Sequence, residues 1–165
     1  MAKEKDVKTN AMRILDRNKI RYRVNTYECG EFIDGIHIAD MLGQAYESSF
    51  KTLVTVGKSG EYFVFAIPLD KELDLKKAAR SVGEKSVELI HVKDITKVTG
   101  YIRGGCTPLG MKKQYPTVVD ETAELFDEII ISGGRIGSQI MIAPDDLIKV
   151  TGGKFEDIVF GSQDG

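Results

Sequence analysis

The sequence is poor in the residue types that build disulfide frameworks and metal sites. Two cysteines, Cys29 and Cys106, and two histidines, His37 and His91, occur in 165 residues, and none has the short spacing of zinc ligands. The cysteines also lack the paired spacing of a disulfide framework, which favours a reducing compartment. We therefore expect no metal ion, no other cofactor and a cytoplasmic location.

Long hydrophobic runs and an excess of one charge are lacking as well. No apolar stretch approaches the roughly 18 residues that span a bilayer, so we expect no membrane partner. The 23 basic and 25 acidic residues give a formal net charge of −2, which argues against a general affinity for nucleic acid. Any contact with a polyanion must come from a local basic patch. The 42% hydrophobic and 29% charged residues match a globular protein.

Hydrophobic periodicity and capping residues predict short helices interleaved with strands. Helices are expected over residues 7–18, 34–43, 74–83 and 144–150. Strands are expected over residues 21–27, 52–56, 62–67, 86–92, 117–120, 128–132 and 139–143. Regular strand-helix alternation, the pattern of a doubly wound sheet, is missing. We predict an α+β fold, a mixed, barrel-like β-sheet with peripheral helices, as a single domain over residues 1–160 followed by a loose tail, 161–165.

Two details of that prediction can be tested residue by residue. Tyr22 and Val24 alternate with Arg21 and Arg23, which predicts that the first two face the core. Two strongly β-forming runs surround Gly57-Lys58-Ser59-Gly60, a sequence that fits a hairpin loop.

Two glycine-rich loops and one lysine differ from plain scaffold. The loop Arg103–Gly110 has three glycines and a proline in eight residues, so it exposes backbone N–H groups that can cradle an oxyanion. The loop Ser132–Ser138 is longer than a hairpin between two apolar strands requires. A surface connection explains each loop equally well. Lys51 begins a strand, where its ammonium either reaches a site or is solvated.

The sequence gives weaker support to the other candidate catalytic and binding residues. Cys106 with His91 as its base would form a nucleophilic pair, but a small cysteine packed beside glycine fits the sequence better. Lys112 and Lys113 follow the first glycine-rich loop and are placed to hold the phosphates of a nucleic-acid end, although most charge runs are solvated faces.

Three segments in a fixed order carry a resemblance to a known family. They are Phe50-Lys51-Thr52-Leu53-Val54, then Gly100-Tyr101 with Gly104 to Lys113, then Ile131-Ser132-Gly133-Gly134-Arg135 leading to Gln139-Ile140 and Pro144-Asp145-Asp146-Leu147. Together they resemble the YbaK family of aminoacyl-tRNA deacylases, which is related to the editing domain of bacterial prolyl-tRNA synthetases. The resemblance covers about residues 9–151.

The resemblance implies a mixed β-barrel with surrounding helices, and a pocket for the amino acid esterified to the terminal adenosine of transfer RNA. We expect catalytic roles for Lys51, the residue tied most closely to activity in the family, and for Gly105. We expect the substrate to contact Tyr27, Phe32, Gly104, Cys106, Ser132 and Gly133. We expect transfer RNA to contact Lys112, Lys113 and Arg135. After the serine, similar proteins often have alanine and lysine, where this chain has glycines and Arg135, which keeps the charge.

The implied activity is trans-editing: hydrolysis of mischarged Cys-tRNA(Pro), and also of Cys-tRNA(Cys). Backbone N–H groups at Gly104 to Cys106 would stabilise the oxyanion, and Lys51 would orient the substrate. Since the chain offers no convincing nucleophile, the thiol of the substrate is expected to attack. Because this attack forms a strained four-membered thiolactone, direct attack by water stays open. The implied partners are the acceptor end of aminoacyl-tRNA and prolyl-tRNA synthetase. Two alternatives stay open: an Ala-tRNA(Pro) deacylase that uses water, and a non-catalytic module that binds transfer RNA or a synthetase.

Overall fold

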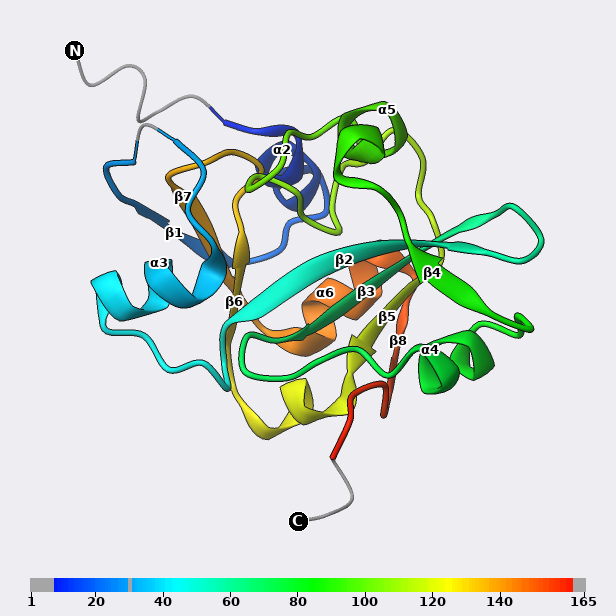
Figure 1. Cartoon of the computed structure of the whole chain (residues 1–165). Coiled ribbons are helices and arrows are strands. Elements are labelled where there is room, and N and C mark those ends of the chain that lie inside the picture. The colour runs from blue at the N-terminus through cyan, green and yellow to red at the C-terminus, as the bar shows by residue number, and fades with distance from the viewer. Residues whose placement is uncertain (1–7, 30, 162–165) are drawn as a thin grey trace.

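The computed structural model describes residues 8–29 and 31–161 (Figure 1). Its helical elements, in chain order, are α2 (Asn10–Arg17), α3 (Gly35–Leu42), α4 (Leu75–Ser81), the 3₁₀ turn η1 (Val92–Asp94), α5 (Ile95–Thr99), the 3₁₀ turn η2 (Glu121–Leu125) and α6 (Pro144–Thr151). Within the described ranges, no helix has the length and apolar character to cross a membrane.

The strands form two sheets. The smaller sheet is antiparallel, in the order β1 (Tyr22–Thr26), β7 (Ser138–Ile142), β6 (Ile129–Ser132). The larger has the order β4 (Val87–Leu89), β2 (Phe50–Gly57), β3 (Tyr62–Pro68), β5 (Thr117–Asp120), β8 (Lys154–Glu156). It is mixed, because β4, β2 and β3 are antiparallel whereas β3, β5 and β8 are parallel.

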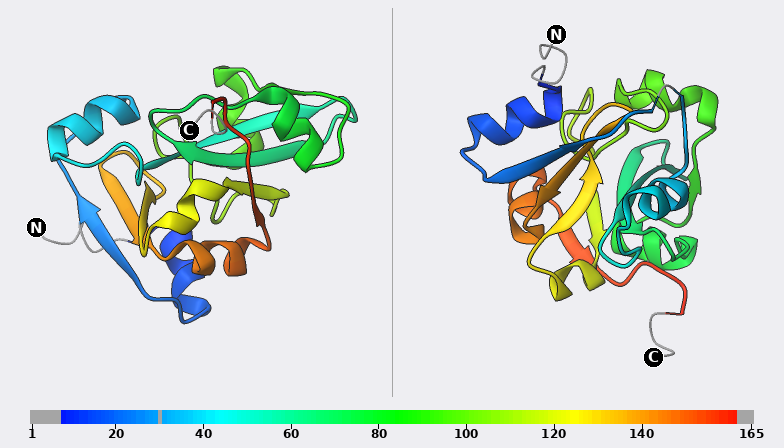
Figure 2. Two further views of the ribbon diagram at one scale, coloured as in Figure 1. Left: turned by 90° about the horizontal axis from the view of Figure 1, so that it is seen from below. Right: turned by 90° about the vertical axis from the view of Figure 1, so that its left-hand side faces the viewer.

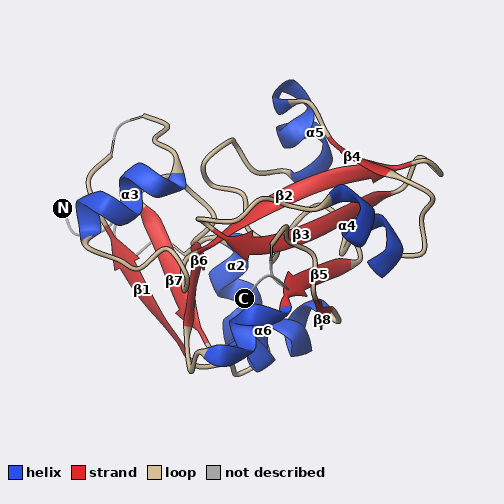
Figure 3. Cartoon of the chain, turned by 60° about the horizontal axis from the view of Figure 1, so that its bottom comes forward, coloured by secondary structure: helices blue, strands red, loops and turns tan. Residues whose placement is uncertain are grey.

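The two sheets meet at one junction. Ser49, just before β2, forms a parallel bridge with Ile130 of β6, and the Ile130 N–H donates to the Ser48 carbonyl at 2.9 Å. Figures 2 and 3 show the sheets side by side, with α2 and α6 against one side of both. The described strands therefore make two joined sheets rather than one closed barrel.

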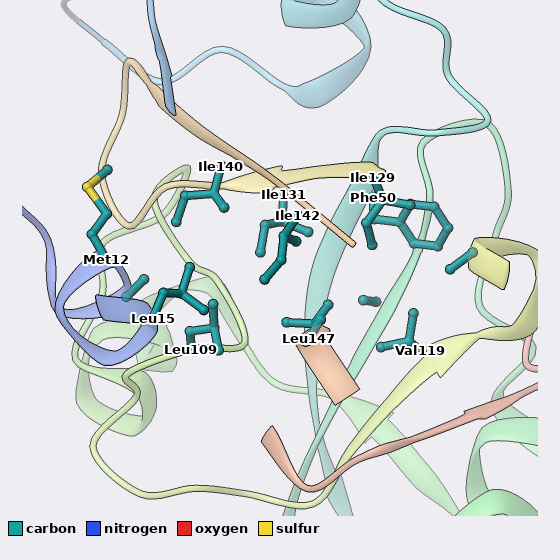
Figure 4. Close-up of a cluster of buried hydrophobic side chains, with 13 residues drawn as sticks. Met12, Leu15, Phe50, Leu109, Val119, Ile129, Ile131, Ile140, Ile142 and Leu147 are labelled. Atoms are coloured by element: carbon teal, nitrogen blue, oxygen red, sulfur yellow. The ribbon is translucent and has the colours of Figure 1, made fainter. Parts of the chain in front are cut away.

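The main hydrophobic core fills the space between these layers. It combines Leu15 of α2, Phe50 of β2, Ile140 of β7 and Leu147 of α6, each at most 4% exposed (Figure 4). Side chains of this size each contribute about 1.5–3 kcal/mol when fully buried. The opposite face of the larger sheet, including the fully buried Phe65, is covered by α4. The core therefore fixes both sheets relative to the helices.

Most predicted elements are confirmed, including the hairpin and the mixed α+β architecture. Asp34 and Asp74 are the N-caps predicted for α3 and α4, with their carboxylates accepting from the N–H groups of His37 and of Lys76. The predicted helix start at Val7 and the tail beyond Gly161 lie outside the described residues.

Three features differ from the prediction. Val24 shares its face with the buried Ile140, yet is 43% exposed on the edge strand β1, whereas Tyr22, two residues earlier, packs against the core as predicted. The predicted strand over residues 86–92 ends at Leu89 and gives way to η1 and α5. Strand β8 was not predicted, since three residues are too few for a visible alternation, and its pairing with β5 is parallel and long-range.

Candidate functional site

A cavity of about 310 Å³ lies at the junction of the two sheets. Its walls come from the N-terminal half of α3, the start of β2, the loop after α5, and strands β6 and β7. Strand β4 pairs with β2 only over Thr55–Gly57, so the edge of β2 at Phe50 to Leu53 is left open toward the cavity. Successive residues of β2 can therefore line the same space.

The structure brings most of the predicted site residues together. Those that line the cavity are Tyr27, Phe32, Lys51, Gly104, Cys106 and Ser132. Those outside the lining are Gly105, Gly133, Lys112, Lys113 and Arg135. The two lysines are exposed, whereas Arg135 is half-buried and its backbone packs against Gly105.

Lys51 is the second residue of β2, half-buried, and opposite Ile67 in the hairpin. Among the described residues, its ammonium has no hydrogen bond and no ion pair. The lining contains one carboxylate, Asp34, which is engaged by His37: its Oδ1 accepts from the His37 N–H at 2.9 Å and lies 2.8 Å from the His37 Nδ1. The hydrogen bonds lower the pKa of Asp34 and raise that of His37. Lys51 thus keeps its positive charge available to a ligand.

Cys106 is placed as a packing residue rather than as a nucleophile. Burial raises the pKa of its thiol to about 11, an effect that a hydrogen bond with Thr99 partly offsets. His91 is exposed and caps η1, and no described hydrogen bond or ion pair joins it to Cys106. At neutral pH the thiol is therefore protonated, and the predicted base His91 does not contact it in the described structure.

The two glycine-rich loops pack backbone against backbone. Gly105 donates its N–H to the Ile102 carbonyl at 2.9 Å, and a Cβ at Gly105 would lie 2.8 Å from the Arg135 Cα. This position differs from the expected one: the Gly105 N–H is used inside the loop and is not free to bind an oxyanion. The N–H groups of Gly104 and Cys106, by contrast, have no acceptor among the described residues.

Gly133 has a similar supporting position. Its N–H donates to the Ser138 carbonyl at 2.8 Å, and a Cβ at Gly133 would lie 2.3 Å from the Ser138 Oγ. The neighbouring Ser132 lines the cavity, and its Oγ accepts from the Gly134 N–H at 3.2 Å. Gly133 therefore shapes the loop that presents Ser132.

The rim of the cavity is aromatic and cationic. The Arg103 guanidinium carbon lies 4.1 Å from the centroid of the Phe32 ring, which is a cation–π distance. Gly104 has φ +90°, and a Cβ there would lie 2.9 Å from the Phe32 ring, so both the backbone and the contact require glycine. Tyr27 is half-buried, and burial raises its pKa.

Sequence reasoning missed a cluster of amide side chains formed by two lining residues, Gln44 and Gln139, and their neighbour Asn25. Gln44 Nε2 donates to Gln139 Oε1 at 2.9 Å, and Gln139 Nε2 donates to Gln44 Oε1 at 3.0 Å. Asn25 Nδ2 donates to the same Gln139 oxygen at 3.0 Å. The one available signal was a glutamine in the apolar strand β7, but its partners lie far away in sequence.

Two hydroxyl groups of lining residues are enclosed within the wall. Thr52 Oγ1 and Ser138 Oγ are buried and have no hydrogen-bond partner in the described structure. Such groups cost free energy unless something satisfies them. No cluster of three or more His, Cys, Asp or Glu side chains suited to a metal ion occurs within residues 8–29 and 31–161.

Comparison with known proteins places this cavity in context. Residues 37–150 match a family described as the aminoacyl-tRNA editing domain. EbsC of Enterococcus faecalis, provisionally named a Cys-tRNA(Pro)/Cys-tRNA(Cys) deacylase, is 45% identical over 160 residues, 96% of this chain and 98% of EbsC.

Two solved structures share the fold at lower sequence identity. The hypothetical protein APE2540 has a TM-score of 0.80 and 23% identity, over 88% of this chain and 95% of its own. A protein provisionally described as a trans-editing enzyme for prolyl tRNA synthetase has a TM-score of 0.76 and 24% identity, over 92% and 93%.

Proposed function

The chain belongs to the aminoacyl-tRNA editing domain family, and we propose that it is a trans-editing deacylase that hydrolyses Cys-tRNA(Pro) and also Cys-tRNA(Cys). The similarity to EbsC over nearly the whole of both chains supports this substrate. One structural observation carries the proposal: Lys51 lines a small, largely apolar cavity, and no residue of the described ranges pairs with its ammonium. Such a charge is suited to an ester whose carbonyl oxygen becomes negative during hydrolysis.

The cavity supplies two kinds of stabilisation for that negative charge. The Lys51 ammonium is a donor from β2, and the N–H groups of two lining residues of the facing loop, Gly104 and Cys106, have no acceptor in the described part of the chain. Donors held in place before the reaction need no reorganisation as charge develops, and a single one typically contributes about 10²- to 10³-fold in rate.

The nucleophile in this proposal is the thiol of the substrate cysteine, because the enzyme's own Cys106 is protonated. The substrate sulfur attacks the ester carbonyl, the bond from that carbon to the 3′ oxygen of the ribose breaks, and the thiol proton passes to that oxygen. Transfer RNA leaves with a free 3′ hydroxyl, and water opens the four-membered thiolactone to give cysteine. Holding the thiol beside the carbonyl offsets part of the strain in this ring.

Transfer RNA would enter past the rim formed by Phe32 and Arg103. Lys112, Lys113 and Arg135 lie outside the cavity lining, where we propose that they hold the phosphates of the acceptor end. With a net charge of −2, the chain depends on such local contacts. We further propose that prolyl-tRNA synthetase presents the transfer RNA, and that this takes place in the cytoplasm.

The test is single-turnover deacylation of purified Cys-tRNA(Pro) by the full chain. Lys51→Met should lower the rate about 10²-fold or more while leaving the melting temperature within a few degrees. Lys58→Met, on the exposed hairpin loop, is the matched control and should react at the normal rate. No deacylation by the unaltered chain, or equal rates for both variants, would overturn the proposal.

A further inference from the structure

The amide cluster forms a fixed polar wall on the outer face of the smaller sheet. Gln139 of β7 stands opposite Asn25 of β1 and opposite Ser132 of β6 in the strand register. Gln139 is 7% exposed, and Gln44 closes over it from the segment that follows α3. The reciprocal Gln44–Gln139 pair therefore holds both amides in one orientation.

The hydrogen bonds leave a definite set of free groups. Gln139 Oε1 already accepts from Gln44 and Asn25, which uses both of its lone pairs. Among the described residues, one lone pair on Gln44 Oε1 and one N–H on each glutamine keep no partner. The wall thus offers neutral donors together with a neutral acceptor.

Positive charges outnumber negative ones in the cavity lining. Lys51 has no partner among residues 8–29 and 31–161, Arg103 lies at the rim, and the single lining carboxylate, Asp34, is hydrogen-bonded to His37. A second positive charge beside Lys51 would be repelled, and the one carboxylate of the lining, Asp34, is exposed and already hydrogen-bonded to His37.

We propose that this cavity binds the aminoacyl ester with its α-amino group uncharged, held against the Gln44–Gln139 amide pair. This inference rests on the proposed function and specifies which form of the substrate binds. A neutral amine has both hydrogens to donate and a lone pair to accept, which matches the mixed donors and acceptor of the two amides. An ammonium group can only donate, and it meets the charge of Lys51.

The resulting pH dependence can be calculated. An α-amino group with a pKa of about 7.7 is about 2% neutral at pH 6 and about 95% neutral at pH 9. Affinity should therefore rise about 50-fold between these values. The titratable groups in the lining are Tyr27, Asp34, Lys51, Arg103 and Cys106. His37, bound to Asp34, also titrates, and its charge acts on an ammonium but hardly on an uncharged ligand, so the pH dependence is measured in His37→Asn as well as in the unaltered chain.

The probes are two stable adenosine derivatives, each with an acyl group joined through an amide bond at the 3′ position. One carries 2-aminobutyrate, which has the α-amino group, and the other carries butyrate, which lacks it. Neither contains a thiol or a cleavable ester, so binding to the full chain is measured by calorimetry without turnover. The amine compound should bind about 50-fold more tightly at pH 9 than at pH 6, whereas the butyrate compound should bind equally at both.

Two variants test the role of the amide pair. Gln44→Glu places a carboxylate beside the amine and should reduce the ratio of affinities between pH 9 and pH 6 to about fivefold or less. Gln44→Met removes the amide without adding charge and should weaken the amine compound while keeping the ratio. Melting temperatures check that both variants are folded.

The outcomes separate this inference from the proposed function. If the amine compound binds equally well at both pH values, or the butyrate compound shows the same rise, the inference is overturned even where Cys-tRNA(Pro) is deacylated. If neither compound binds at any pH and no deacylation occurs, the proposed function fails and the inference fails with it.

Discussion

The close packing of the two glycine-rich loops predicts a large effect for the smallest change there, Gly105→Ala. The added Cβ would lie 2.8 Å from the Arg135 Cα and 3.1 Å from the Arg135 nitrogen. Carbon atoms in contact are normally about 3.5–4.0 Å apart, so the loops must separate by roughly 1 Å. Both neighbours are backbone atoms, and neither can rotate away as a side chain would.

Two consequences follow from this separation. Overpacking of this kind costs about 1–3 kcal/mol, which corresponds to roughly 2–12 °C in melting temperature for a chain of this length. The displacement also moves Cys106 and Ser132 relative to each other across the cavity, and a misplacement of about 1 Å can cost about 10²-fold in rate. We therefore expect the rate to fall far more than the modest loss of stability explains.

The assay combines single-turnover deacylation of Cys-tRNA(Pro) with thermal melting. Gly57→Ala is the matched control, because the Cβ there would meet the carboxylate end of Glu84, a flexible side chain, at 2.5 Å. It should lose some stability and keep the normal rate. If Gly105→Ala keeps both its melting temperature and a rate within threefold of the unaltered chain, the inferred contact between the loops does not matter.

Three further predictions concern protonation and the substrate. Cys106, with a pKa of about 11, carries about 300-fold less thiolate at pH 7.5 than an ordinary thiol. Mass spectrometry should therefore show very slow labelling of Cys106 by iodoacetamide, and rapid labelling would contradict this. The variant Cys106→Ser should keep most of the deacylation activity. The His37–Asp34 pair should stabilise the fold slightly at pH 5 and lose this effect as the pH rises above about 6.5 and through the raised pKa of His37. The melting temperatures of the unaltered chain and of His37→Asn should therefore converge toward pH 9. A constant difference between them from pH 5 to pH 9 would disprove this. Serine and alanine esters of tRNA(Pro) should react far more slowly than the cysteine ester at saturating enzyme, whereas rates within about tenfold would indicate an attacking water.

Local signals in the sequence were sufficient for much of the fold. The caps Asp34 and Asp74 act on N–H groups two or three residues away, so a short stretch of sequence specifies them. Strand β8 and the exposure of Val24 depend on what packs beside them, which no local pattern encodes.

The sequence predicted those site residues that lie within the family motifs. Lys51, Gly104 and Ser132 belong to the quoted motifs and do line the cavity. The supporting position of Gly105 arises from its contact with Arg135, and the amide pair joins Gln44 to Gln139. These partners are remote in sequence, so only the folded arrangement of the two sheets brings them together.

The junction at Ser49 and Ile130 also has a consequence for folding. The cavity takes its walls from both sheets, and its lining extends along the chain from Tyr27 to Gln139. Contacts of such high sequence separation form late, because loop closure must be completed before they contribute. No fragment that lacks either sheet can contain the cavity, and a ligand that fills it stabilises the native state as one cooperative unit. Slowed hydrogen exchange in both sheets on ligand binding would be the signature of that coupling.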